Sequence, residues 1–296
     1  MKKLQNINNI KRNHIEGKNI FLLFHNKFFN YLSKQFGYKF FILFLISILI
    51  KIPGIISHFF RTSLNIKKPE NILFQKNILR ELNEFGFSLI SDSCFSLSFI
   101  DKLSNSFYEK YAIEKISKIT EPMIYEPLSK INLNKVLSII EKNYMSMISK
   151  YLFMLPYLKT VTYMYSKNEK TLKNSSQYWH LDKTGPRTLK LFLSLHDQTE
   201  KNGPLTFIDS KRSEYLVNRF KYSKTNQFKR LSDELINKEF DNLKFKPSRF
   251  IDKKGSLAFL DTDRCLHYGS RKSENPRLFL YIEFGSYLDF KIPFLF

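Results

Sequence analysis

The 296-residue sequence predicts a mainly β fold with flanking helices (α+β). We expect a double-stranded β-helix, or cupin-like jelly roll, behind an N-terminal helical extension. Two observations favour this fold. The leucines at 189, 191, 193 and 195 alternate strictly, as the buried face of a strand does. Further short apolar runs are separated by loops that contain Gly or Pro, and do not alternate regularly with helices. This arrangement is typical of two packed antiparallel sheets rather than of repeated βαβ units.

The individual elements follow from the period of the apolar residues. Apolar residues every three or four positions predict helices over 71–85, 99–111, 134–150 and 225–242. Ser98 stands where it could cap the second of these helices. Alternation and short apolar runs predict strands over 158–165, 188–195, 205–208, 256–261 and 278–284. The helix over 225–242 interrupts the strand series, and we interpret it as a candidate lid over the site or as a surface excursion.

A His-x-Asp pair lies in the segment Trp179-His180-Leu181-Asp182. On an extended segment, side chains two positions apart point to the same side, so both ligand groups of the pair would face one site. His267, beside a later apolar strand, adds a second imidazole. Two imidazoles and one carboxylate on one side of a metal are the ligand set of non-haem iron(II) oxygenases, because three coordination positions stay open for chemistry. Tyr178 and Trp179 could wall the pocket or pack in the core.

Arg277 follows His267 by ten positions. A guanidinium presents a planar pair of N–H donors that matches a carboxylate, which makes it a suitable group for holding a dicarboxylate co-substrate. An ion pair with Glu283 or another acid of the sheet is the alternative role for this arginine.

The order of these motifs resembles the phytanoyl-CoA dioxygenase-like family of iron(II)- and 2-oxoglutarate-dependent oxygenases. The resemblance covers roughly residues 75 to 290, and its most specific part is 178 to 284, with motifs at 179–182, 191–198, 202–205, 255–261 and 267–270. One departure stands out. Ile208-Asp209-Ser210-Lys211 occupies the place of the Pro-Gly-Ser-His turn that usually ends the family's Asn-Gly-Pro-Leu strand.

The resemblance implies which residues bind which group. His180, Asp182 and His267 would be the catalytic metal ligands for Fe(II), and Arg277 with Ser273 would hold the distal carboxylate of 2-oxoglutarate. Dioxygen would be the second co-substrate, and the implied reaction is hydroxylation of an unactivated C–H bond. The carboxylate of Asp182 argues against halogenation, because halogenating relatives carry a small residue there. The alternative function is a non-catalytic jelly-roll binding or scaffold protein at a membrane.

Residues 1–70 differ in composition from the expected dioxygenase domain, residues 71–296. They hold 12 Lys and Arg against two acids and so contribute much of the net charge of +21. The run from Phe40 to Ile50 has no charged residue, but it is shorter than the about 20 apolar residues of a spanning helix. Lys51 and Pro53 interrupt any longer helix. Three interpretations of 40–60 stay open: a spanning helix, a helix lying in an anionic membrane surface, or a helix packed on the domain.

The expected partners and location follow from these features. A small-molecule, acyl, lipid-linked or glycan-linked substrate is expected at the site, and an anionic membrane surface at residues 1–70. Nucleic acid is not an expected partner, because the lysines form no compact stripe and no recognition motif accompanies them. Two cysteines, Cys94 and Cys265, form no disulfide framework, and reduced iron and 2-oxoglutarate are cytosolic. We therefore expect a cytoplasmic protein attached to the cytosolic face of a membrane.

Overall fold

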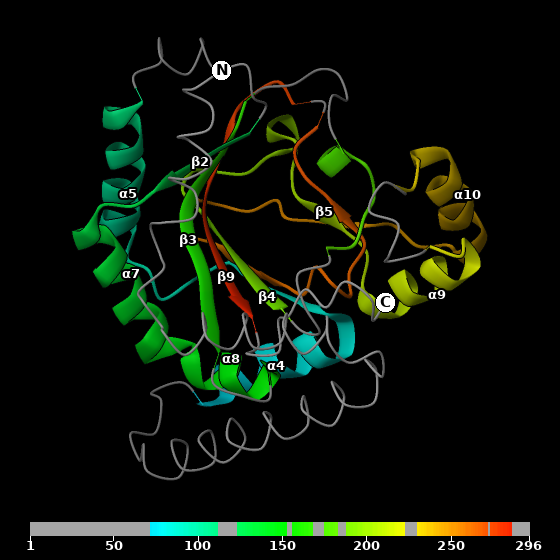
Figure 1. Ribbon diagram of the computed structural model, residues 1–296, viewed down its shortest axis with the longest axis horizontal. Coiled ribbons are helices and arrows are strands. Elements are labelled where there is room, and N and C mark those ends of the chain that lie inside the picture. The colour runs from blue at the N-terminus through cyan, green and yellow to red at the C-terminus, as the bar shows by residue number, and fades with distance from the viewer. Residues whose placement is uncertain are drawn as a thin grey trace, which may run out of the picture.

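A large antiparallel sheet forms the centre of the molecule (Figure 1). The computed structural model describes residues 72–111, 123–152, 156–167, 175–182, 188–222, 230–271 and 273–285. In the large sheet the strand order is β1-β7-β4-β9-β3-β2, and every pairing is antiparallel. Its strands are β1 (Phe87–Ile90), β2 (Met123–Pro127), β3 (Tyr157–Ser166), β4 (Thr188–Ser194), β7 (Leu257–Leu260) and β9 (Arg277–Gly285).

A smaller sheet faces the large one. It has the order β6-β5-β8, with β5 (Thr206–Phe207), β6 (Ser248–Arg249) and β8 (His267–Tyr268). Two isolated antiparallel bridges extend it beyond β8, one between His267 and His180 and the next between Trp179 and Leu231. The segment around His180 is therefore a further strand position of the small sheet.

The path of the chain confirms the predicted double-stranded β-helix. From β3 onward the chain alternates between the sheets. It passes from β3 to the His180 segment, then to β4, β5 and β6, β7, β8 and β9. This alternation winds the strands around one interior, as in a jelly roll.

Three apolar clusters hold the layers together. Helices α4 (Ile72–Phe85), α5 (Leu97–Lys110), α7 (Lys130–Asn143) and α8 (Met145–Leu152) supply the residues that cover the outer face of the large sheet. Between the sheets lies a second cluster that includes Met164, Phe192 and Phe279. Helices α9 (Ser210–Arg219) and α10 (Asp233–Leu243) cover the outer face of the small sheet through a third cluster.

The predicted strand over 188–195 is confirmed, but it is not half-buried. Leu189, Leu191 and Leu193 face the helices, as their alternation indicates. The intervening Phe192 packs in the cluster between the sheets, so β4 is buried on both faces. A strand in the middle of two layers has no solvent face, which the leucine pattern alone could not reveal.

Several predicted helix boundaries are wrong, some of them by a turn or more. Ser96, not Ser98, is the N-cap residue of α5, and its hydroxyl accepts from the amide of Phe99. The helix predicted over 134–150 is two helices, α7 and α8, separated at Tyr144. The helix predicted over 225–242 begins later, at α10, and α9 was not predicted.

The N-terminal extension, residues 1–70, and its segment 40–60 lie outside the described residues. Among the helices that are described, none is long and apolar enough to cross a membrane. The predictions for this extension are therefore not tested by the structure.

Candidate metal centre

The small sheet brings His180 and His267 together. The amide of each residue donates to the carbonyl of the other, at 3.0 Å in both directions. Residues directly opposite each other in an antiparallel pair project their side chains to the same face. The two imidazole rings accordingly lie with their centroids 4.3 Å apart. A reciprocal backbone pair thus sets the spacing of two of the three predicted ligands.

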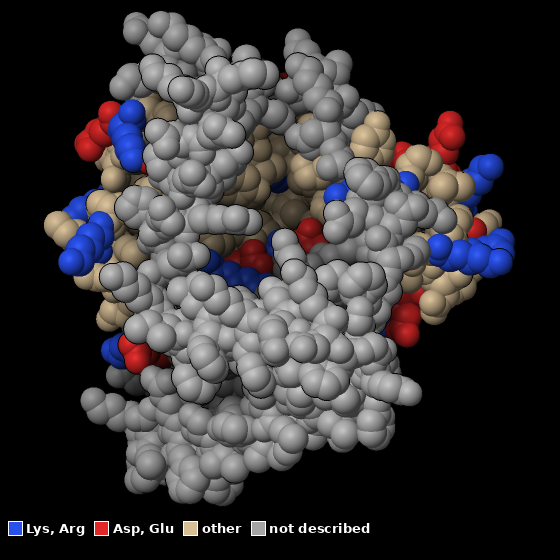
Figure 2. Space-filling view, viewed as in Figure 1, with Lys and Arg blue, Asp and Glu red and all other residues tan. Residues whose placement is uncertain are grey.

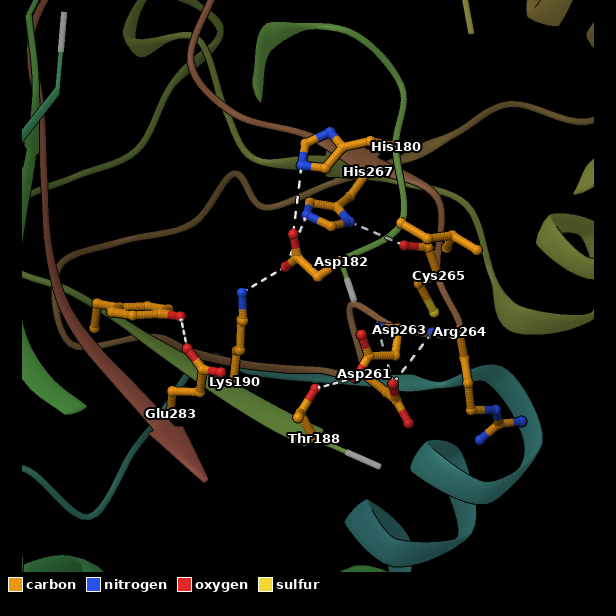
Figure 3. A network of polar contacts seen from close by, with 12 residues as sticks. His180, Asp182, Thr188, Lys190, Asp261, Asp263, Arg264, Cys265, His267 and Glu283 are labelled. Atoms are coloured by element: carbon orange, nitrogen blue, oxygen red, sulfur yellow. Dashed lines mark hydrogen bonds and ion pairs between the residues drawn. The ribbon is translucent and has the colours of Figure 1, made fainter. Parts of the chain in front are cut away.

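Asp182 completes the group two residues after His180 (Figure 3). Its amide donates to the carbonyl of Thr262 at 2.9 Å, which fixes the backbone at this point. Its carboxylate faces the Nε2 atoms of both rings, with Oδ1 3.6 Å from Nε2 of His180 and Oδ2 3.5 Å from Nε2 of His267. One ligand atom from each residue lies within 4.8 Å of the other two. The structure therefore places all three predicted metal ligands in one cluster.

Backbone carbonyls orient both imidazoles. Nδ1 of His180 lies 2.7 Å from the carbonyl of Tyr178, and Nδ1 of His267 lies 3.0 Å from the carbonyl of Cys265. A carbonyl can only accept, so each Nδ1 carries the hydrogen and each Nε2 keeps its lone pair for the centre. This is the tautomer that binding of a metal through Nε2 requires.

The ionisation states also suit a metal. Burial and the neighbouring imidazole lower the pKa of His180 to about 3, against the opposing effect of Asp182. Burial likewise lowers the pKa of His267. Burial alone would raise the pKa of Asp182, but Lys190 and the two imidazoles outweigh it and hold that pKa well below its usual range. Two neutral imidazoles and one carboxylate fit Fe(II) with open positions for other ligands.

Lys190 is a site residue that the sequence analysis missed. It lies on β4, and its ammonium donates to Oδ2 of Asp182 at 2.5 Å (Figure 3). Burial alone would lower the pKa of Lys190, but Asp182, Tyr281 and Glu283 raise it well above its ordinary value. The lysine therefore stays charged and holds one oxygen of the ligand carboxylate. The sequence did contain a signal for this residue. Lys190 is a single charged residue inside an apolar strand, and it lies on the same face as Phe192.

Arg277 lies at the start of β9 with an exposure of 1%. Its Nη1 donates to the carbonyl of Gly203 at 2.9 Å, and its Nη2 lies 3.4 Å from the hydroxyl of Ser166. Its Nε is buried and has no hydrogen-bond partner, and no carboxylate of the described residues lies within ion-pair distance. Burial lowers its pKa to about 10, so the guanidinium is still charged at neutral pH.

Of the two residues predicted near Arg277, Glu283 has other partners, and the role of Ser273 at a bound carboxylate stays a prediction. Glu283, the alternative ion-pair partner, is bound instead by Lys159 at 3.4 Å and by the hydroxyl of Tyr281 at 2.5 Å. Ser273 is buried, but its described hydrogen bond runs to the carbonyl of Lys167. Ser166 on β3 is the serine found at Arg277, because residue 166 lies opposite residue 277 in the strand register.

Two further predictions about the surroundings need correction. Trp179 does not wall the pocket: its ring packs in the third apolar cluster, edge-on to Tyr268, and its Nε1 donates to Asp233 of α10. Helix α10 thus lies behind the small sheet, so this part of the candidate lid does not cover the metal site. Residues 223–229 lie outside the described residues, and a lid role for them stays a prediction.

Comparison with known proteins leaves the family open. No family model matches this chain, and no curated protein matches it in sequence. The similar solved structures include the non-haem α-ketoglutarate-dependent carbocyclase SnoK from nogalamycin biosynthesis, 13% identical over 71% of this chain and 83% of SnoK, with a TM-score of 0.46. HygX from Streptomyces hygroscopicus, solved with nickel and 2-oxoglutarate, is 12% identical over 71% of this chain and 86% of HygX, with a TM-score of 0.47.

A Pseudomonas putida prolyl-4-hydroxylase is 12% identical over 72% of this chain and 98% of its own, with a TM-score of 0.45. Similarity at this level does not identify a reaction. Membership of the phytanoyl-CoA dioxygenase-like family stays a hypothesis, and the chemistry of this chain has to be inferred from its own residues.

Proposed function

We propose that this protein is an Fe(II)- and 2-oxoglutarate-dependent dioxygenase that hydroxylates an unactivated C–H bond. The single observation that carries the proposal is the cluster of His180, Asp182 and His267 with both imidazole Nε2 atoms facing one carboxylate. No apolar core needs this arrangement, since it gathers two buried imidazoles and a partly exposed carboxylate around a point where a metal would satisfy all of them.

The three residues would hold the iron through Nε2 of each histidine and an oxygen of Asp182. Iron(II), with 2-oxoglutarate and dioxygen, supplies the oxidising power that hydroxylation of such a bond needs. The carbonyls of Tyr178 and Cys265 would keep both rings in the ligating orientation. Lys190 would restrict Asp182 by holding one of its oxygens, which favours binding of the iron by the other. With the carboxylate present, hydroxylation is favoured over halogenation.

Arg277 supports 2-oxoglutarate as the co-substrate. A buried guanidinium without an acid is costly, and a distal carboxylate would supply the missing charge and acceptors. Phe279 lies under this guanidinium, with its ring centroid 5.0 Å away. The apolar cluster of Met164, Phe192 and Phe279 surrounds this part of the interior with side chains of low polarity, which strengthens such an ion pair.

A non-catalytic binding or scaffold protein is the alternative. It would have no need for neutral, oriented imidazoles beside an ionised carboxylate. The substrate class stays open at this stage between small molecules, acyl or lipid-linked chains and glycan-linked groups.

The test is an anaerobic titration of the full chain with iron(II) and then 2-oxoglutarate. A visible metal-to-ligand charge-transfer band is expected in the wild type and in Arg219→Gln, a variant of an exposed residue on α9. It should be absent in His267→Ala. A folded wild-type protein without the band would refute the proposal and favour the non-catalytic alternative.

A further inference from the structure

Arg230 lies next to the metal centre because of the outermost bridge of the small sheet. The amide of Leu231 donates to the carbonyl of Trp179 at 3.0 Å, and the two residues face each other in an antiparallel bridge. In this register Arg230 stands opposite His180. Trp179 and Leu231 both pack in the apolar cluster outside the small sheet. Side chains alternate along a strand, so Arg230 and His180 project to the inner side.

The charge of Arg230 affects the pKa of two of the metal ligands. It contributes to lowering the pKa of both His180 and His267. This effect agrees with the register, which brings the guanidinium to the same side of the sheet as the two imidazoles.

Arg230 has no partner for its buried nitrogen. Its Nε is buried without a hydrogen bond, and no carboxylate of the described residues lies within ion-pair distance. Neighbouring arginines are different. Arg271 pairs with Asp233 at 2.8 Å, and Arg212 pairs with Asp209 at 2.6 Å. In the described parts of the chain, buried guanidinium nitrogens without a partner occur only in Arg277 and Arg230.

The charges of a loaded centre leave Arg230 uncompensated. Of the other charges beside the centre, Asp182 is paired with Lys190 and Glu283 with Lys159. The distal carboxylate of 2-oxoglutarate would pair with Arg277, and Arg230 would then still have no acid of the described residues within ion-pair distance. Figure 2 shows charged side chains of both signs in the hollow at the middle of the face that it views. Binding of an additional anion would be favoured beside Arg230.

We propose that Arg230 binds an oxyanion, a carboxylate or a phosphate, carried by the primary substrate. This inference rests on the proposed function and narrows its substrate class to compounds with an anionic group near the C–H bond that reacts. The guanidinium suits either anion, because both accept two parallel N–H bonds. Arg230 would orient the substrate beside the iron, while Arg277 holds the co-substrate.

The experiment uses the full chain loaded with cobalt(II), a paramagnetic substitute for iron(II), and saturated with 2-oxoglutarate. Two probes are added separately: inorganic phosphate, observed by its ³¹P relaxation, and acetate, observed by the relaxation of its methyl protons. Binding near cobalt should accelerate relaxation of at least one probe, and the more strongly affected probe identifies the anion class. Arg230→Gln should weaken binding of that probe about tenfold, as expected for the loss of one charge-assisted contact. Arg219→Gln changes an exposed residue of α9, on the outer face of the small sheet, and should bind the probe like the wild type.

The anaerobic iron(II) and 2-oxoglutarate charge-transfer band serves as the second readout. It should be the same in Arg230→Gln as in the wild type, which separates this inference from the proposed function. If the wild type lacks the band, the proposed function fails and the inference fails with it. If the band is normal but neither probe is relaxed, or both proteins relax the probes equally, only the role of Arg230 is refuted. Loss of the band in Arg230→Gln would assign this arginine to 2-oxoglutarate instead and also overturn the inference.

Discussion

Asp182 faces two imidazoles on one side and the ammonium of Lys190 on the other. Removing its carboxylate therefore has two separate effects. Asp182→Ala should weaken iron binding and abolish 2-oxoglutarate turnover, because one of three ligands is lost. It should also lower the free energy of unfolding by roughly 3 kcal/mol, because Lys190 keeps a buried charge without its partner.

A double variant separates these effects. Asp182→Ala with Lys190→Met should recover most of the lost stability while iron binding stays weak, because a flexible apolar side chain replaces the unpaired ammonium. Denaturant unfolding and metal titration on the same preparations measure both quantities. Succinate production by either variant would refute the assignment of Asp182 as a ligand.

Arg277 leads to the opposite expectation for stability. Arg277→Leu should raise the apparent KM for 2-oxoglutarate on the order of 10²-fold, because the distal carboxylate loses its charged donor. The substitution removes a buried guanidinium that has no ion pair. It therefore leaves no acid of the described residues without a partner. The thermal midpoint of the ligand-free protein should therefore stay the same or rise. Iron binding should barely change. A large loss of stability with an unchanged KM would remove Arg277 from the co-substrate site.

At the residue scale, the sequence predicted the groups that follow from short spacings. His180 and Asp182 share a face because they are two positions apart on an extended segment. The contacts of Lys190, Arg230 and Ser166 depend on which strands are neighbours, and that pairing is a tertiary property. Ser166 was not predicted, and the register of β3 and β9 places it beside the guanidinium, while the assignment of Ser273 stays a prediction.

At the scale of elements, Asp209 explains why a helix follows β5 at the place where this chain departs from the Pro-Gly-Ser-His turn of the family that it resembles. Its carboxylate accepts from the amide of Arg212 at 3.0 Å and so caps α9. It also pairs with the half-exposed guanidinium of the same arginine. An Asp at an N-cap position, where its side chain can accept from the amide three residues later, is a signal that the sequence contained. The apolar period alone did not reveal it, because α9 is short and largely polar.

Two substitutions at this position distinguish the cap from the ion pair. Asp209→Ala should lower the free energy of unfolding by about 1 kcal/mol, because α9 loses its cap. Asp209→Asn keeps an acceptor oxygen and loses only the partly exposed ion pair, so it should cost much less. Denaturant unfolding of both variants provides the comparison. Equal losses would show that the ion pair, not the cap, stabilises this end of α9.

At the scale of the whole molecule, residues 1–70 carry 12 of the basic residues and an apolar run, and their role is still a prediction. We expect the full chain to co-sediment with vesicles that contain anionic lipid and not with purely zwitterionic vesicles. Attraction between lysines and anionic headgroups is screened by salt. Binding that weakens at high salt would support attachment in the plane of the membrane. Resistance to salt and alkaline washing would indicate a spanning helix, and a failure to sediment would favour packing on the domain.

The reciprocal backbone pair of His180 and His267 has a consequence for motion. Strands β5, β6 and β8 have two residues each, so few ladder hydrogen bonds hold the small sheet. A metal bound by both side chains would link the segments of His180 and His267, which are far apart in the chain. Opening of this pair would then require release of the metal. The amides of His180 and His267 should exchange with deuterium much more slowly in the metal-loaded protein, while the amides of β9 change little. Equal protection of these amides from exchange with and without metal would show that the contacts of the small sheet already stabilise this pair.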